Sequence, residues 1–254
     1  WDNYCRLPGK IRDGDTGAVA ADHYRLYKED VGLMKEMGAK AYRFSISWPR
    51  IFPQGTGSAN PKGLDFYNRL VDELLAAGIQ PYVTLYHWDL PQALQDKGGW
   101  QSRDTAAAFG EYSGHVAKAL SDRVRHFFTI NEFSVFVELG HRGIDTVENG
   151  KPSRIEHAPG LRLAPAELNQ VRHHAVLAHG LAVQAIRASG RISTRIGLAE
   201  NVSIAVPVID NAAHVRAAEA ATRDQNAPYL GVILDGKYSD SYLSGAGKDA
   251  PKVA

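Results

Sequence analysis

Segments with helical periodicity alternate with short apolar segments along almost the whole chain of 254 residues. Residues 22–37 have apolar side chains at helical spacing and are followed by Gly38, a residue type that often caps helix C-termini. By the same criteria, strands are expected at residues 41–48, 81–86, 125–130 and 194–198, and further helices at 64–77, 103–120, 164–188 and 211–223. Strands separated by helices indicate a parallel sheet with helical crossovers, and no low-complexity linker divides the chain.

Two parallel architectures are compatible with this alternation. A doubly wound nucleotide-binding sheet would have a glycine-rich turn between a strand and a helix. Gly55 and Gly57 are the nearest candidates, but they lie in a proline-containing loop and lack the rest of the motif. Polar and aromatic residues gather instead at the ends of the expected strands, at Arg43, Trp48, His87, Trp88, Asp89, Asn131, Glu132, Glu200 and Asn201. A (β/α)8 barrel draws its active site from the C-terminal ends of several strands, so the barrel is the predicted fold.

Asn131 and Glu132 are the most informative of these strand ends. They follow an apolar, β-branched and aromatic segment typical of a buried strand. A carboxyl group between such a strand and solvent tends to have a raised pKa, as a general acid near neutral pH requires. The alternative is a solvated and inert Asn-Glu pair at the strand end.

Composition and charge exclude several classes of function. The net charge is +1, with 29 basic and 28 acidic residues interspersed, which predicts neither a nucleic-acid partner nor an anionic membrane partner.

Cys5 is the sole cysteine, so an intrachain disulfide and a cysteine metal cluster are excluded. His173, His174 and His179 do not have the i, i+4 spacing of a helical zinc pair, and packing is their expected role. No cofactor is expected, and a cytoplasmic location is the default expectation.

Three segments carry a resemblance to a known family. Residues 42–50, 84–91 and 129–132 together resemble family 1 glycoside hydrolases, the β-glucosidase family. Shorter motifs support the resemblance in the order in which the family has them, at Trp1-Asp2, residues 60–63, Phe66-Tyr67, residues 98–100, residues 157–160, His173-His174 and Ala178-His179. The motifs extend along nearly the whole chain.

The resemblance implies a (β/α)8 barrel of which this chain covers about strands two to five with the surrounding helices. Family members are considerably longer. Their first strand would precede Trp1, and the strand with the nucleophilic glutamate would follow residue 254. Residues 1–254 are therefore expected to form a single, incomplete barrel domain of a longer protein, because an incomplete barrel leaves open sheet edges.

The activity implied by the resemblance is hydrolysis of β-glucosides or cello-oligosaccharides with retention of configuration. Retention requires two carboxyl groups about 5–5.5 Å apart. Glu132 would be the acid/base, and Arg43 would keep the missing nucleophile ionised. Substrate-binding residues are expected at His87, Trp88, Asn131 and Asn201. In this set Asn131 would bind the sugar 2-hydroxyl, and Trp88 would be an apolar wall.

Structural interpretations remain open for several of these residues. Arg43 on a buried strand could be an ion-pair partner, and His87 could be a hydrogen-bonded core histidine. Trp48 and Trp100 are expected to pack in the core or a loop. The alternative function is a non-catalytic carbohydrate-binding protein on a degenerate or truncated barrel that lacks the nucleophile.

Two features of the sequence depart from the family pattern. Glu148 lies in a segment that looks like the nucleophile motif, but it comes only sixteen positions after Glu132, in a polar loop. Its Asn149-Gly150 neighbours predict a turn and no catalytic role. The residue after Glu132 is Phe133, where the family usually has Pro, and the next residue is Ser134, where many members have Trp. The binding site for the leaving group is therefore expected to differ in shape from that of other members.

Overall fold

A four-stranded parallel sheet forms the centre of the computed structural model, which describes residues 1–191 and 193–253. Its strands are β1 (Ala41–Ser45), β2 (Gln80–Tyr86), β3 (His126–Asn131) and β6 (Arg195–Ala199), paired in that order. The predicted alternation of strand and helix is therefore confirmed. β1 and β6 are the edge strands of this sheet, so both ends of the ladder are open within the part of the chain described.

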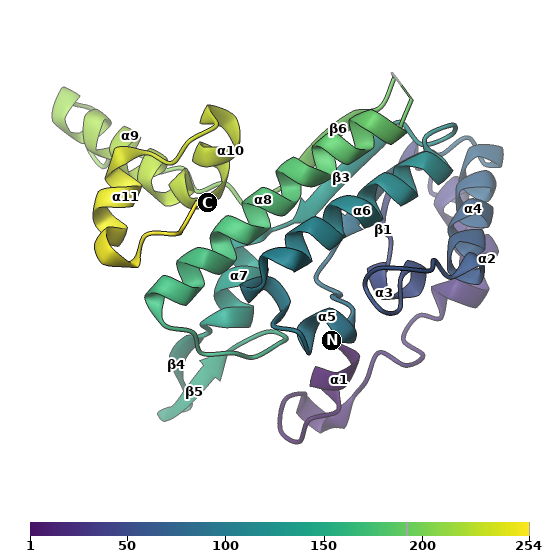
Figure 1. Cartoon of the computed structure of the whole chain (residues 1–254), viewed down its shortest axis with the longest axis horizontal. Coiled ribbons are helices and arrows are strands. Elements are labelled where there is room, and N and C mark those ends of the chain that lie inside the picture. The colour runs from purple at the N-terminus through teal and green to yellow at the C-terminus, as the bar shows by residue number, and fades with distance from the viewer. Residues whose placement is uncertain (192, 254) are drawn as a thin grey trace.

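Helices connect the strands and cover the sheet (Figure 1). The long ones are α2 (His23–Glu36), α4 (Pro61–Ala76), α6 (Arg103–Leu120), α8 (Pro165–Ser189) and α9 (Ala212–Asn226). The short ones are α1 (Asp2–Cys5), α3 (Trp48–Ile51), α5 (Gln92–Gln95), α7 (Phe133–His141), α10 (Val232–Asp235) and α11 (Asp240–Ala246). Single turns occur at Arg12–Gly14, Gly99–Gln101, Ala227–Gly231 and Gly247–Asp249.

Helices α6 and α8 lie side by side across one face of the sheet (Figure 1). Gly110 and Gly114 of α6 face Leu181 and Ala185 of α8, and a Cβ added at either glycine would lie 3.1–3.3 Å from a Cβ of the other helix. The absence of side chains at these two positions lets the helices approach closely. Their inner faces bury an apolar core against the strands.

Aromatic rings fill the core beneath the strand ends. Trp48 is fully buried, its ring lies parallel to that of Tyr112 with centroids 5.2 Å apart, and its Nε1 donates to the Gly55 carbonyl oxygen at 3.1 Å. Trp100 is also buried, and its Nε1 donates to the Tyr86 hydroxyl at 3.0 Å. The packing role expected of both tryptophans is confirmed.

The structure corrects some expected boundaries. The first strand ends at Ser45 and does not reach Trp48, which begins α3. Pro49 explains the change, because proline favours the first turn of a helix and cannot donate to a ladder. Helix α4 begins at Pro61, three residues earlier than expected, where the Asn60 side chain accepts a hydrogen bond from the Lys62 N–H.

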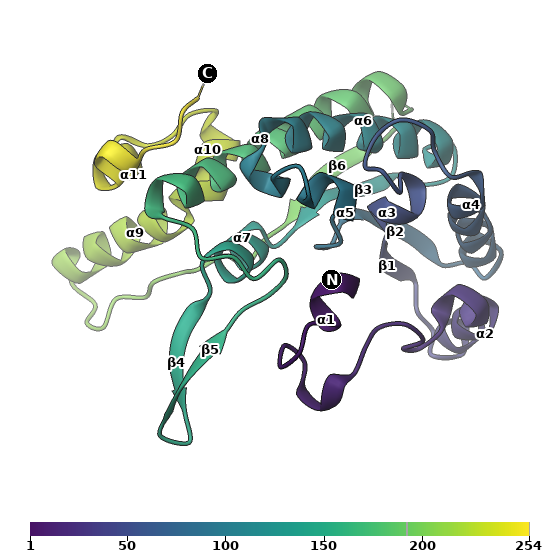
Figure 2. The ribbon, with the colours of Figure 1, turned by 60° about the horizontal axis from the view of Figure 1, so that its bottom comes forward.

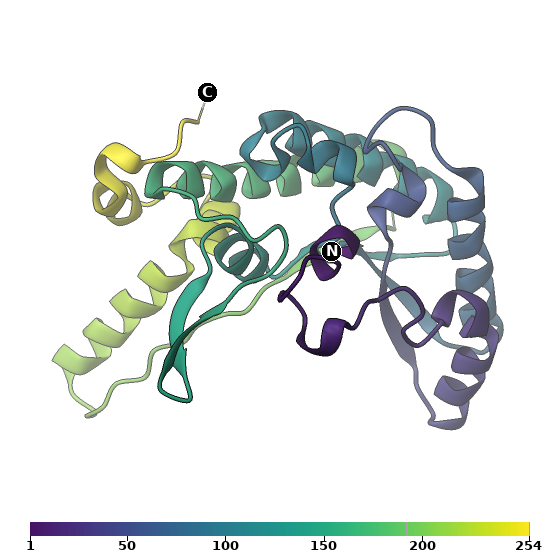
Figure 3. The same ribbon diagram turned by 90° about the horizontal axis from the view of Figure 1, so that it is seen from below.

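The segment expected to be a long polar loop contains ordered structure. Helix α7 follows Glu132 directly, and β4 (Ile144–Glu148) pairs antiparallel with β5 (Lys151–Ile155). Asn149 and Gly150 have φ values of 51° and 74°, as a two-residue hairpin turn of the primed type requires. The predicted turn is confirmed, whereas the expectation of a long polar loop without a strand before the turn was wrong. The hairpin projects away from the sheet (Figures 2 and 3), with Glu148 exposed near its tip.

Among residues 1–191 and 193–253, no helix combines the length and the apolar character needed to cross a membrane.

Two helical glycines provide a matched test of packing. A Cβ at Gly63 in α4 would lie 2.1 Å from the Arg50 carbonyl oxygen, whereas a Cβ at Gly32 in α2 would have no neighbour within 4 Å. We expect Gly63→Ala to lower the free energy of unfolding by about 1–3 kcal/mol through overpacking. Gly32→Ala should raise it by up to about 1 kcal/mol, because alanine favours the helix. Urea unfolding followed by circular dichroism measures both, and equal effects would contradict the close contact at Gly63.

Candidate active site

The C-terminal ends of β1, β2 and β3 lie next to one another because the strands are parallel and in register. Asn131, the last residue of β3, is buried, and both atoms of its side-chain amide have partners. Arg43 Nη1 donates to Asn131 Oδ1 at 3.0 Å, and Asn131 Nδ2 lies 3.3 Å from His87 Nε2. The structure thus brings Arg43, His87 and Asn131 into one hydrogen-bonded group.

Arg43 and His87 are each held by a second contact. The Arg43 guanidinium lies over the Phe128 ring at 5.6 Å from its centroid, and His87 Nδ1 lies 3.2 Å from Ser45 Oγ. Within the described residues no carboxylate pairs with Arg43, so the ion-pair interpretation of Arg43 is not supported. His87 is exposed at the strand end, so it is not a core histidine.

Trp88 is fixed beside this group. Its Nε1 donates to the Asn131 carbonyl oxygen at 2.8 Å, and its ring meets the His87 ring edge-on with centroids 5.1 Å apart. The backbone φ of Trp88 is +81°, an uncommon value for a bulky residue. Such a conformation persists only where surrounding contacts hold it, which is typical of functional sites.

Glu132 stands at the junction of β3 and α7. It has a left-handed backbone (φ 50°, ψ 73°), and its N–H donates to the Ala199 carbonyl oxygen at 2.6 Å. The residue is half-buried. Desolvation lowers the pKa of both His87 and His157, and the negative charge of Glu132 acts in the opposite direction on each. Glu132 therefore lies close enough for its charge to act on two histidines, His87 after β2 and His157 in the loop after β5.

Asn201 follows the last strand and is exposed. Its neighbour Glu200 turns its carboxylate toward the first residues of α7, where Phe133 N donates to it at 2.5 Å. The sequence identified Glu200 as a polar strand end but gave it no role. Nothing in its type or spacing could have done so, because the contact joins residues 67 positions apart.

His157 is a second residue whose place the sequence did not predict. Its ring lies 5.3 Å from that of Trp88 and 5.5 Å from that of Trp1. Its backbone N–H donates to the Leu139 carbonyl oxygen at 3.0 Å, and its Nδ1 is buried without a protein partner. The sequence indicated a role for His157 only through the motif at residues 157–160, which supports the family resemblance.

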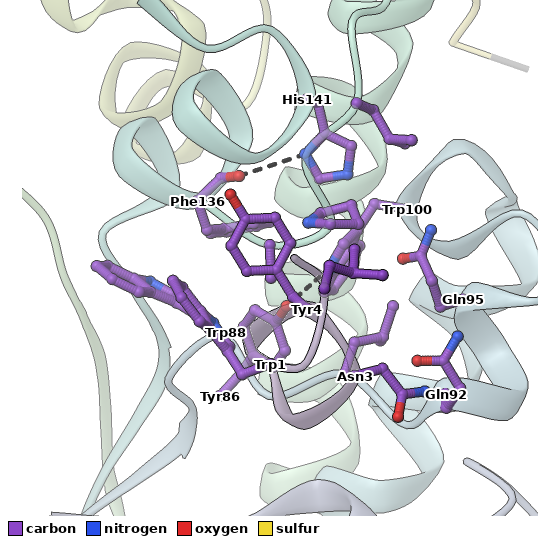
Figure 4. Close-up of a pocket in the computed structure, with 15 residues that line it drawn as sticks. Trp1, Asn3, Tyr4, Tyr86, Trp88, Gln92, Gln95, Trp100, Phe136 and His141 are labelled. Atoms are coloured by element: carbon purple, nitrogen blue, oxygen red, sulfur yellow. Dashed lines mark hydrogen bonds between the residues drawn. The ribbon is translucent and has the colours of Figure 1, made fainter. Parts of the chain in front are cut away.

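A pocket adjoins the site on the side of Trp88 (Figure 4). Aromatic rings dominate its lining, which includes Trp1, Tyr4, Trp88, Trp100, Phe136 and His141. Burial lowers the pKa of His141 to about 4, so this imidazole is neutral at pH 7. The pocket therefore combines aromatic rings with the uncharged amide side chains of Asn3, Gln92 and Gln95, and the N-terminal segment closes it from one side.

The three histidines of α8 have separate partners. His173 Nδ1 contacts the Tyr238 hydroxyl, His174 Nδ1 the Trp100 carbonyl oxygen and His179 Nδ1 the Thr129 hydroxyl, at 2.7–2.9 Å. Their expected packing role is confirmed. Within residues 1–191 and 193–253, no three His, Cys, Asp or Glu side chains are grouped so that they could hold a metal ion. That the protein needs no cofactor stays a prediction.

The protonation state of His87 can be tested directly. Desolvation first, and the Arg43 cation second, lower its pKa below the usual 6.5, so His87 should be neutral at pH 7 with Nε2 as an acceptor for Asn131. We expect an NMR titration to place its midpoint below 6.5, and the Arg43→Met substitution to raise it. A midpoint above 6.5 in the unsubstituted protein would contradict this electrostatic arrangement.

Comparison with known proteins gives the site a family. The sequence profile of the family described as "Glycosyl hydrolase family 1" matches residues 1–253. "Beta-glucosidase A" of Acetivibrio thermocellus is 48% identical over 244 residues, which cover 96% of this chain and 51% of that protein. "Beta-glucosidase" of Agrobacterium sp. is 42% identical over 254 residues, which cover 100% of this chain and 52% of that protein. The chain thus spans about half the length of the relatives it matches.

Comparison with solved structures supports the same family. A β-glucosidase from Thermotoga maritima in complex with deoxynojirimycin superposes with a TM-score of 0.84 at 40% identity, covering 99% of this chain and 54% of that one. Virulence factor SghA from Agrobacterium tumefaciens gives a TM-score of 0.86 at 40% identity, covering 100% and 54%. The four parallel strands and their helices are part of a (β/α)8 barrel, as predicted. The chain belongs to glycosyl hydrolase family 1.

Proposed function

We propose that this chain forms the acid/base side of a retaining β-glucosidase, as one part of a barrel whose other strands carry the nucleophile. The observation that carries the proposal is the position of Glu132 directly after Asn131, whose amide is held between Arg43 and His87. The 254 residues are then an incomplete catalytic domain of a longer protein. Its substrates would be β-glucosides or cello-oligosaccharides.

The chemistry follows from the needs of acetal cleavage. The transition state resembles an oxocarbenium ion, and the departing oxygen must be protonated. Glu132 would donate this proton and would then, as a base, activate the water that releases the glycosyl-enzyme. Asn131 would bind the 2-hydroxyl, a contact that strengthens in the transition state. His87, Trp88 and Asn201 would bind the remainder of the substrate.

Arg43 would act on the nucleophile across the site. A carboxylate from a later strand that approached Arg43 would have its pKa lowered by the cation and would stay ionised. Arg43 has donors to spare, because its described hydrogen bonds come from a single nitrogen, Nη1. Glu148 is a poor candidate for the same role, because it is exposed on the projecting hairpin.

The test is hydrolysis of 4-nitrophenyl β-D-glucoside by the intact protein, expressed from its complete reading frame, with the first product followed by proton NMR. The proposal predicts glucose that appears first as the β-anomer. An α-anomer first, or no hydrolysis of any β-glycoside, would contradict it.

A second candidate is a carbohydrate-binding protein without catalysis. In that case the intact protein would bind glucosides without turnover. The predictions of a cytoplasmic location and of no nucleic-acid partner remain predictions.

A further inference from the structure

The carboxylate of Glu200 caps the N-terminus of α7. Its Oε2 accepts from the Phe133 N–H at 2.5 Å, and its Oε1 accepts from the Ser134 N–H at 3.4 Å, the Ser134 hydroxyl at 2.6 Å and the Asn201 N–H at 3.1 Å. All four partners donate, as suits an ionised carboxylate. A negative charge at a helix N-terminus is also stabilised by the helix dipole. Burial raises the pKa of Glu200, and these hydrogen bonds oppose that effect.

This cap fixes the backbone of Glu132 from both sides. The N–H of Glu132 donates to the Ala199 carbonyl oxygen, and the next two N–H groups along the chain donate to Glu200. Ala199 and Glu200, at the end of β6, thus accept hydrogen bonds from the backbone N–H groups of three consecutive residues, 132–134, at the start of α7. Glu132 itself is in the left-handed region, with φ 50°, which is strained for a residue other than glycine. Contacts of this kind are what a strained conformation needs in order to persist.

The cap depends on two residues at which the chain departs from the family pattern. Phe133 has the N–H that the usual proline would lack, and Ser134 adds a hydroxyl donor. The Phe133 ring is buried and packs against Tyr229 and His179, with centroids 5.7 Å and 6.3 Å away. Phe133, Ser134 and Glu200 therefore act as one unit, which connects β6 to the residue after Glu132.

We infer that Glu200 is the positioning residue for the Glu132 side chain and sets its alignment with the departing oxygen. This inference rests on the proposed function, in which Glu132 is the acid/base. An acid that is displaced by about 1 Å loses on the order of 10²-fold in rate. The loss should depend on the leaving group, because a leaving group that departs as a stable anion needs no proton.

The experiment compares an alkyl β-glucoside with 2,4-dinitrophenyl β-glucoside in the intact protein, for Glu200→Ala and Glu200→Gln. We expect Glu200→Ala to lower kcat/KM for the alkyl glucoside by about 10- to 100-fold. The dinitrophenyl glucoside should change by less than about threefold, because its cleavage does not require the acid. Glu200→Gln keeps one acceptor oxygen and the side-chain volume, so it should recover part of the loss.

The matched control is Glu167→Ala. Glu167 also accepts from a helix-terminal backbone group, the Ala164 N–H at 3.0 Å, but it does so at the start of α8. Its loss should reduce stability without any dependence on the leaving group.

If Glu200→Ala slowed both substrates equally, or slowed neither, the positioning role would be overturned while the proposed function stood. If the unsubstituted protein cleaved neither substrate, the proposed function would fail and this inference with it. Should Glu200→Ala not fold, the same comparison with Glu200→Gln decides.

Discussion

Replacing Glu132 by glutamine is expected to lower kcat/KM for cellobiose by about 10²- to 10⁴-fold, the usual contribution of a general acid. Glutamine preserves the shape and the backbone contact to Ala199 but has no acidic proton to donate. Substrates with dinitrophenolate leaving groups should lose far less in the glycosylation step. Azide should restore part of the rate on these activated substrates, because a small anion can attack the glycosyl-enzyme without a base. Steady-state kinetics on the intact protein with the two substrates measures the difference.

Glu148→Gln is the matched control for this substitution. Glu148 has the same side chain as Glu132, but it is exposed on the hairpin formed by β4 and β5. Its replacement should change neither rate by more than about twofold, as is usual for a surface position. A Glu132→Gln variant with undiminished activity on cellobiose would remove the acid/base assignment.

The second large effect concerns stability. Trp48→Ala should lower the free energy of unfolding by about 3–5 kcal/mol, the range for a large aromatic residue truncated in a packed core. Trp48 is fully buried, lies against Phe109 and Tyr112, and donates to the Gly55 carbonyl oxygen. The variant would lose these contacts and leave a cavity beneath the strand ends. Urea unfolding followed by far-ultraviolet circular dichroism gives the free energy without relying on tryptophan fluorescence.

Val208→Ala serves as the control for this measurement. Val208 is 90% exposed, and its truncation should change the free energy of unfolding by less than about 0.5 kcal/mol. A loss of under about 1 kcal/mol in Trp48→Ala would contradict the tightly packed aromatic core.

The order of strands and helices could be predicted from the sequence because it depends on local periodicity. All four strands of the parallel sheet and its long helices were expected within a few residues of their observed bounds. The sequence does not predict helix α7 (Phe133–His141), because it is short and separated from β3 only by Glu132, and its apolar run Phe133–Val137 is interrupted by a single polar residue. The hairpin of β4 and β5 was missed because its burial is slight, so no alternation of apolar and polar residues marks it.

The sequence predicted Arg43, His87 and Asn131 as candidate site residues, but it predicted neither the contacts among them nor the places of His157 and Glu200. Arg43, His87 and Asn131 were chosen from the strand ends and from the family resemblance, and the parallel register brings them together. The capping contact of Glu200 with Phe133 depends on the fold, which joins the end of β6 to the start of α7. No local pattern encodes such a contact.

The most direct test of the account is to locate the nucleophile. The intact protein would be inactivated with 2-deoxy-2-fluoro-β-D-glucosyl fluoride, which reacts to form a slowly hydrolysed glycosyl-enzyme. Proteolysis and mass spectrometry would then identify the labelled residue. The account predicts a label on a carboxylate outside residues 1–254, with Glu132 unmodified. A label on Glu132 or Glu148, or the absence of any label, would contradict it.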